Sequence, residues 1–175
     1  RSVNIANRLT LFRLILVPVF TFAVLLDVPG GAYIAAVVFT IASITDGLDG
    51  YLARSRQEVT KFGKLMDPIA DKLLITAALV CLVQLNQISA WAALVIIGRE
   101  FAVSGLRMIA ASDGVVISAS KWGKVKTVSQ IIAVLALLLQ VPWANYFLWF
   151  TVIATVISGV HYFLQAQDIL KDSMK

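Results

Sequence analysis

Charged residues, cysteine and histidine are all scarce in this 175-residue sequence. Only 14% of the residues are charged, against roughly 25% in an ordinary soluble domain, and 59% are hydrophobic. The single cysteine, Cys81, excludes an internal disulfide and a zinc cluster, and we interpret it as a small buried apolar residue. The single histidine, His161, lies in an apolar run, and we interpret it as structural. The sequence therefore offers no Ser–His or Cys–His pair that would indicate a covalent intermediate. This composition favours a lipid bilayer as the solvent.

Six apolar runs are candidates for membrane-spanning helices, which need roughly 17–25 mostly apolar residues. They cover about residues 9–26, 32 to the acidic motif at 46, 67–85, 89–110, 127–141 and 143–164. The breaks at 28–31, 85–89 and 140–145 predict tight turns on one side of the membrane. The breaks at 55–64 and 112–124 predict longer connections on the other side. The sequence therefore predicts an all-α polytopic membrane protein with six transmembrane helices in a single domain, residues 1–175.

The distribution of basic residues predicts the orientation in the membrane. The three tight turns contain no Lys or Arg, and all 15 of these residues lie in or near the opposite compartment. The positive-inside rule makes that compartment the cytoplasm and places both termini there. The net charge of +5 is thereby explained without a nucleic-acid partner. We interpret Trp91, Trp143, Tyr146 and Trp149, near the opposite helix ends, as interfacial anchors, and expect no cleavable signal peptide.

Four of the ten acidic residues are aspartates gathered between positions 46 and 71. Asp46 and Asp49 are three apart at the end of the second expected span, and Asp67 and Asp71 are four apart at the start of the third. Both spacings place side chains on one helix face, and the connection returns the chain to the same side of the membrane. Four carboxylates can therefore face one point at the cytoplasmic boundary.

These carboxylates would repel one another and would be costly to desolvate without a compensating positive charge. Arg54 and Lys72 are nearby but too few. A set of oxygen ligands favours Mg²⁺ or Mn²⁺, or Ca²⁺, and four carboxylates suit two bridged metal ions best. Helix capping is the alternative, because Asp67 followed by Pro68 resembles an N-cap with proline at the first helical position.

Small residues accompany the acids. Gly50 and Ala53 share the helix face of Asp46 and Asp49 and predict the floor of a ligand pocket, whereas Gly47 also fits a simple helix–helix contact.

The spacing of these residues resembles a family signature. The stretch fits D-x2-D-G-x2-A-R-x8-G-x3-D-x3-D at every fixed position, and this pattern resembles that of the CDP-alcohol phosphatidyltransferases. The resemblance implies CDP-diacylglycerol as donor, two divalent metal ions (Mg²⁺ or Mn²⁺), an acceptor alcohol, release of CMP and a homodimer. It implies metal ligation by Asp46, Asp49, Asp67 and Asp71, and makes Asp71 the general base for the acceptor hydroxyl. The CDP-binding residues that it implies are Asp46, Gly50, Ala53, Arg54 and Gly63.

A second group of charges predicts a phosphate on the acceptor. Arg99 and Arg107 are eight residues apart, which is about two helical turns, so both can lie on one side of a helix. Lys124 and Lys126 follow at the start of the fifth expected span. Charges inside a membrane helix need partners; Glu100 could pair with one arginine, and an acceptor phosphate could pair with several of the cations.

The acceptor itself is predicted only by resemblance. GREFAVSGLR (98–107), GKVKTVSQ (123–130) and NIANRLTLFR (4–13) resemble the family members that use glycerol 3-phosphate. Members that use a phosphorylated inositol remain an alternative, because metal ligands do not distinguish the two acceptors. A small cation transporter is the alternative from another class, although internal repeats and acids at the membrane midplane, which are typical of transporters, are not apparent.

Overall fold

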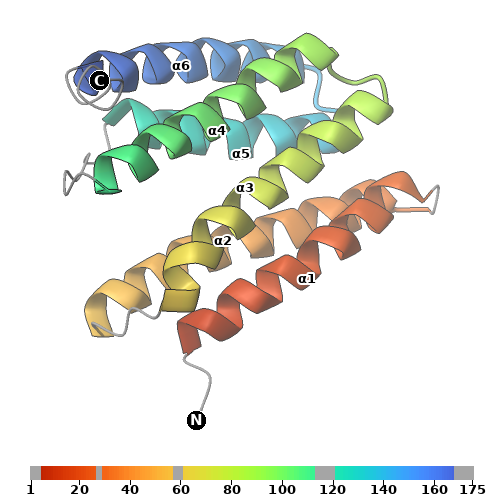
Figure 1. Cartoon of the computed structure of the whole chain (residues 1–175). Coiled ribbons are helices and arrows are strands. Elements are labelled where there is room, and N and C mark those ends of the chain that lie inside the picture. The colour runs from red at the N-terminus through yellow and green to blue at the C-terminus, as the bar shows by residue number, and fades with distance from the viewer. Residues whose placement is uncertain (1–4, 27–28, 57–60, 113–120, 168–175) are drawn as a thin grey trace. The chain divides into compact units, whose positions relative to one another are not determined.

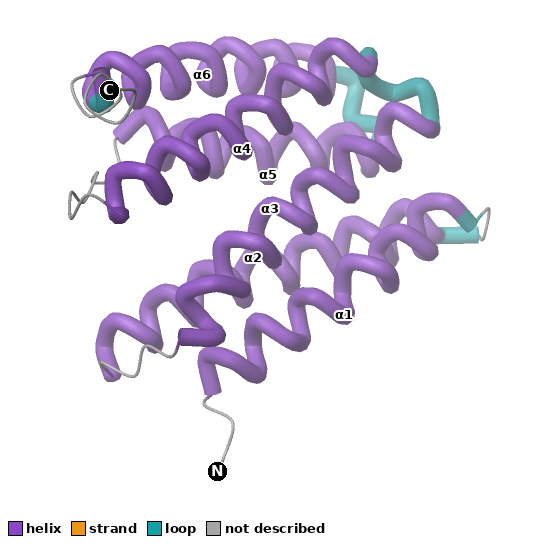
Figure 2. Tube along the Cα trace, in the orientation of Figure 1, coloured by secondary structure: helices purple, strands orange, loops and turns teal. Residues whose placement is uncertain are grey.

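The structure is a computed structural model that describes residues 5–26, 29–56, 61–112 and 121–167. The side chains of residues 5, 6, 48–56, 61–65, 67, 68 and 121 lie outside that description. Within the described residues the secondary structure is six α-helices without a strand (Figure 2). The helices are α1 (Ile5–Leu25), α2 (Gly31–Arg56), α3 (Lys61–Gln84), α4 (Ala90–Ser112), α5 (Lys121–Leu138) and α6 (Ala144–Gln165). The predicted all-α class is confirmed.

The helices α1, α2 and α3 belong to one compact unit, called here the first unit. α1 packs against both α2 and α3, and α2 also contacts α3. Phe20 of α1 and Phe39 of α2 are fully buried against each other, with ring centroids 5.7 Å apart. Figure 1 shows the start of α1, the end of α2 and the start of α3 at the same end of this unit. The acidic motif is therefore gathered at one end of three packed helices.

The second unit contains α4, α6 and α5 as far as Ala136, and in it α4 packs against α6. Val103 and Leu106 of α4 form a buried cluster with Tyr162 and Ala166 near the end of α6. The buried face of α6 also carries hydroxyl side chains at helical spacing: Thr151, Thr155 and Ser158. Polar groups of α6 therefore face the interior of this unit.

The predicted turns at 85–89 and 140–145 are confirmed by short breaks between helices. Asn86 (φ 56°) and Gln140 (φ 51°) adopt left-handed backbone conformations that reverse the chain, as does Gly30 (φ 78°) just before α2. Ser89 caps α4, because its Oγ accepts a hydrogen bond from the Ala92 amide at 3.2 Å.

Two expected helix starts were wrong. α3 begins at Lys61, six residues before Asp67, so Asp67 is inside the helix and is not its N-cap. α5 begins at Lys121 rather than near Thr127. α2 runs through the acidic motif to Arg56, as the shared helix face of Asp46, Asp49, Gly50 and Ala53 requires. Apolar composition marks the part of a helix that lipid can cover, whereas the backbone hydrogen bonds of a formed helix extend through polar residues beyond it.

Much of the described surface is apolar, as expected of a membrane protein. Asn7–Leu25 and Ala144–Gln165 are long and apolar enough to cross a bilayer, and Gly31–Gly47 is apolar but shorter. Large apolar side chains lie exposed on several helices, among them Phe22 (64%) and Leu94 (59%). Many exposed large apolar side chains are expected where a surface contacts lipid. A membrane protein is therefore supported, while six spans and the positions of the termini stay predictions.

Candidate active site

Asp46 of α2 forms an ion pair with Arg13 of α1. Nη1 of Arg13 donates a hydrogen bond to Oδ1 of Asp46 at 2.5 Å. The Arg13 side chain has no exposed surface, whereas the Asp46 side chain is 38% exposed. A guanidinium inside packed apolar helices requires a carboxylate or comparable partner, and the packing of α1 against α2 supplies one. α1 thus contributes a residue to the acidic site that the sequence analysis did not identify, although a charge within the apolar run 9–26 was its signal.

Asp71 is the second predicted site acid whose side chain is described. It lies exposed on α3, next to the half-buried Lys72 and one residue after the fully buried Ala70. The role of Asp71 as general base stays a prediction.

Asp49 lies on α2 and Asp67 on α3, but their side chains fall outside the described residues. The described side chains alone contain no group of three His, Cys, Asp or Glu that could hold a metal ion. The carboxylates of Asp46 and Asp71 nevertheless suit a hard divalent cation, because such cations prefer oxygen ligands. Each carboxylate has two oxygens and about four acceptor positions. Asp46 can therefore accept from Arg13 and still ligate a metal ion.

The helical course of α2 supports the predicted register of the CDP-binding residues. Because α2 runs unbroken to Arg56, Gly50 and Ala53 follow Asp46 by four and seven residues on one helix face. Arg54 lies in the same helix and Gly63 in the first turn of α3, and the side chains of this set are not described. Gly47 is exposed, and an added Cβ there would meet nothing within 4 Å. A close helix–helix contact at Gly47 is therefore not observed among the described atoms.

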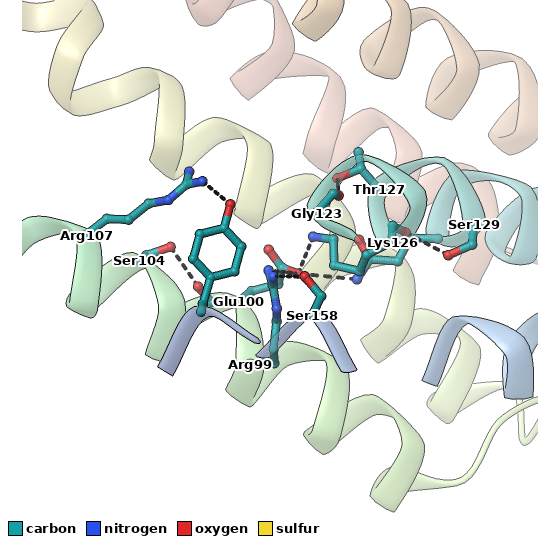
Figure 3. Close-up of polar contacts among 11 residues, drawn as sticks. Arg99, Glu100, Ser104, Arg107, Gly123, Lys126, Thr127, Ser129 and Ser158 are labelled. Carbon is teal, nitrogen blue, oxygen red and sulfur yellow. Dashed lines mark hydrogen bonds and ion pairs between the residues drawn. The ribbon is translucent and has the colours of Figure 1, made fainter. Parts of the chain in front are cut away.

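In the second unit, Glu100 of α4 is the centre of a buried network of charges (Figure 3). Lys126 of α5 donates to Oε1 of Glu100, and Arg99 forms a longer ion pair with the same oxygen at 3.5 Å. Nε2 of Gln130 also donates to it at 3.4 Å. Glu100 and Lys126 are 7% and 5% exposed. The expectation that Glu100 pairs with one arginine is confirmed for Arg99, and Lys126 shares the carboxylate.

α6 holds both arginines of α4. Nη2 of Arg99 donates to Oγ of Ser158 at 2.5 Å, and Nη2 of Arg107 donates to Oη of Tyr162 at 2.5 Å. The guanidinium carbons of Arg99 and Arg107 lie 5.4 and 4.9 Å from the centre of the Tyr162 ring, within cation–π range. Neither Ser158 nor Tyr162 was predicted from the sequence as a site residue. Their signal was polar side chains four residues apart in an apolar run.

The four predicted phosphate-binding residues are only partly brought together. Arg99 and Lys126 meet at Glu100, and Arg107 meets Arg99 at Tyr162. Lys124 is exposed and lies two residues before Lys126, a spacing that turns the two lysines to different faces of α5. Cys81 is buried with a free thiol, as predicted.

Residues 3–157 match the family model described as CDP-alcohol phosphatidyltransferase, and the chain belongs to this family. The family is membrane-embedded and depends in general on divalent metal ions. A cation transporter gains no support from this membership.

Three similar proteins share one name, CDP-diacylglycerol–glycerol-3-phosphate 3-phosphatidyltransferase. The Bacillus subtilis protein is 44% identical to this chain, and the match covers 97% of this chain and 98% of the relative. The Haemophilus influenzae protein is 38% identical, with 98% of each covered. The Rickettsia bellii protein is 37% identical, with 91% of this chain and 93% of the relative covered.

Proposed function

We propose that the protein transfers a phosphatidyl group from CDP-diacylglycerol to glycerol 3-phosphate, giving phosphatidylglycerol phosphate and CMP. The observation that carries this proposal is the match, over nearly the full length of both chains, to relatives named for this reaction. The acidic end of the first unit and the cationic network of the second unit supply the kinds of residue that the reaction needs.

Phosphoryl transfer depends on positioning and on charge neutralisation more than on covalent help from the protein. Asp46, Asp49, Asp67 and Asp71 would hold two Mg²⁺ or Mn²⁺ ions, which neutralise the diphosphate and the departing CMP when bound. Arg13 keeps the Asp46 carboxylate in place. Asp71, which is exposed, accepts the proton of the 1-hydroxyl of the acceptor as that oxygen attacks the phosphorus that carries diacylglycerol. Gly50, Ala53, Arg54 and Gly63 bind the CDP part of the donor.

The acceptor phosphate is bound by the cations of the second unit. Arg99, Arg107, Lys124 and Lys126 form the proposed set. Glu100 partly neutralises Arg99 and Lys126. The guanidinium of Arg107, on an exposed residue, is paired with no carboxylate within the described part of the chain. Arg107 is therefore the strongest anchor for a phosphate in this set, since its charge is not already compensated.

The placement in the cell follows from charge distribution. We infer six spans in the cell membrane as one domain, with both termini and the active site facing the cytoplasm, because the three tight turns lack Lys and Arg. A homodimer follows from family resemblance. Attaching a membrane-impermeant label to single cysteines introduced at Gln87 and Lys171, in a Cys81→Ala background, tests the orientation. Labelling of position 87 but not position 171 from outside intact cells is the expected result.

The activity is tested by CMP release from the purified wild-type protein with CDP-diacylglycerol and Mg²⁺ or Mn²⁺. Glycerol 3-phosphate, inositol 1-phosphate, inositol and serine are compared as acceptors, each with an EDTA control. Release only with glycerol 3-phosphate and metal supports the proposal. Release with inositol 1-phosphate instead would retain the four-aspartate site and overturn the acceptor. Undiminished release in EDTA would overturn the proposed metal site.

A further inference from the structure

Tyr162 is a buried residue between the two arginines of α4. It is 1% exposed, and its hydroxyl accepts a hydrogen bond from Arg107 at 2.5 Å. Arg99 also lies within cation–π range of its ring, at 5.4 Å. Arg99 and Arg107 are two turns apart on α4, so one aromatic side chain from α6 touches both. Neither the signature motif nor the proposed phosphate set includes this tyrosine.

The chemistry of Tyr162 differs from that of Glu100, the other residue that holds cations in this unit. Glu100 is an anion, so each cation that it orients also loses part of its charge to it. The phenol of Tyr162 is neutral, so it can fix the direction of a guanidinium without compensating the positive charge. Arg107, held in this way, keeps its charge for an external anion.

A guanidinium that is already oriented also loses less freedom when an anion binds. Arginine is long and has many rotamers, and ordering such a side chain on binding weakens affinity. A hydrogen bond at one Nη group and the ring contact restrict Arg107 before any ligand arrives. The remaining N–H groups of the planar fork are of the kind that binds phosphate in a bidentate manner.

We propose that Tyr162 is a positioning residue for the acceptor-phosphate site: its hydroxyl and ring hold Arg107, with Arg99 beside it, ready to bind the phosphate of a phosphomonoester. This inference rests on the phosphate-binding part of the proposed function. It goes beyond that proposal, because it assigns the affinity for phosphate partly to a neutral side chain on α6.

The test compares Tyr162→Phe with Tyr146→Phe, which is the same change at an exposed position of the same helix. Phenylalanine keeps the ring and the packing and removes only the hydroxyl. Calorimetric titration of the detergent-purified proteins with inorganic phosphate and with glycerol 3-phosphate, at fixed ionic strength, needs no turnover. We expect Tyr162→Phe to weaken both affinities about fivefold to tenfold, a loss typical of one hydrogen bond of ordinary net strength. Tyr146→Phe should leave both unchanged.

Steady-state kinetics supply the readout that a merely structural role would not produce. Tyr162→Phe should raise KM for glycerol 3-phosphate by the same factor, while kcat and KM for CDP-diacylglycerol stay within about twofold of the wild type. An unchanged phosphate affinity in Tyr162→Phe, or a wild type that binds no phosphate, would overturn the inference. So would equal losses in both variants, or a general fall in kcat and thermal midpoint.

The two proposals fail separately. If the wild type releases no CMP with glycerol 3-phosphate, but Tyr162→Phe binds phosphate more weakly than the wild type, the proposed acceptor is overturned and the inference is retained. If the wild type is active with glycerol 3-phosphate but Tyr162→Phe has the same KM for this acceptor, the proposed function is retained and the inference is overturned.

Discussion

Arg13 and Asp46 join the buried interior of the first unit to its acidic end. The arginine has no exposed surface, and the aspartate with which it pairs at 2.5 Å is partly exposed. The two residues are 33 positions apart and lie on different helices. An acid predicted to bind metal is therefore anchored by a charge from the packed core, so the position of that acid depends on how α1 packs against α2.

The first prediction concerns the strength of this pair. Asp46→Ala leaves the buried guanidinium of Arg13 without its carboxylate partner and should lower the thermal midpoint of unfolding by about 5–10 °C. The expected loss is smaller than for a fully buried pair because the Asp46 side chain is partly exposed. A thiol-reactive dye measures the midpoint, because Cys81 is the only cysteine and is buried. Arg13→Met combined with Asp46→Ala should cost less than the sum of the single changes. Additive losses would contradict the coupling, and Arg8→Met, at an exposed position of α1, is the matched control.

The second prediction concerns the acids of α3. Asp71→Asn, which removes the proposed base, should reduce CMP release at least about a hundredfold while the Cys81-reported midpoint stays within a few degrees of the wild type. Asp67→Asn should have a comparable effect through the lost metal ligand. Both changes preserve side-chain size, so activity and folding can be separated. Substantial turnover in either variant would remove that residue from the site.

The third prediction concerns Arg107. Arg107→Ala should raise KM for glycerol 3-phosphate at least about tenfold, because an uncompensated guanidinium contact to phosphate is lost. KM for CDP-diacylglycerol is the internal control and should not change. Arg107→Lys should recover only part of the loss, since an ammonium keeps the charge but lacks the planar fork. Steady-state kinetics with both substrates varied provide the measurement, and an unchanged KM for glycerol 3-phosphate would exclude Arg107 from acceptor binding.

The fourth prediction concerns Glu100, which serves Arg99 and Lys126 together. Glu100→Gln leaves these cations without their shared negative charge in a buried setting and should lower the thermal midpoint by about 6–15 °C. Gln130→Leu removes a neutral donor whose hydrogen bond to Glu100 is long, at 3.4 Å, and should have a smaller effect. Equal midpoints for Glu100→Gln and the wild type would show that the network does not stabilise the fold.

The fifth prediction compares two glycines. A Cβ at Gly105 would meet nothing within 4 Å, so Gly105→Ala should stabilise α4 by about 0.5–1 kcal/mol. A Cβ at Gly159 would lie 3.1 Å from Cγ of Arg99, whose guanidinium is held by Ser158. Gly159→Ala should therefore stabilise less than Gly105→Ala or destabilise the protein. Thermal midpoints of the two variants measured side by side decide this, and equal gains would show that the Arg99 stem moves aside freely.

Local patterns in the sequence were sufficient for several features. Apolar runs separated by polar breaks predicted an all-α protein, and the described residues form helices joined by the expected turns at 85–89 and 140–145. The expected pairing of Glu100 with an arginine follows from neighbouring positions in one segment. Spacings of three and four set the register of the aspartates, because an α-helix repeats every 3.6 residues regardless of its surroundings. Helix ends were less predictable, since hydrogen bonding continues past the apolar segment at α3 and α5.

The sequence by itself therefore determined the helical class, the family signature and the faces on which the acids lie, because each depends on residues close together in the chain. Only the tertiary structure decided which distant charges meet: Arg13 with Asp46, Lys126 with Glu100, and Arg107 with Tyr162, which are 33, 26 and 55 residues apart. Such pairs form because helix packing removes charged and polar groups from solvent and leaves a few partners within reach, and no local periodicity specifies those partners.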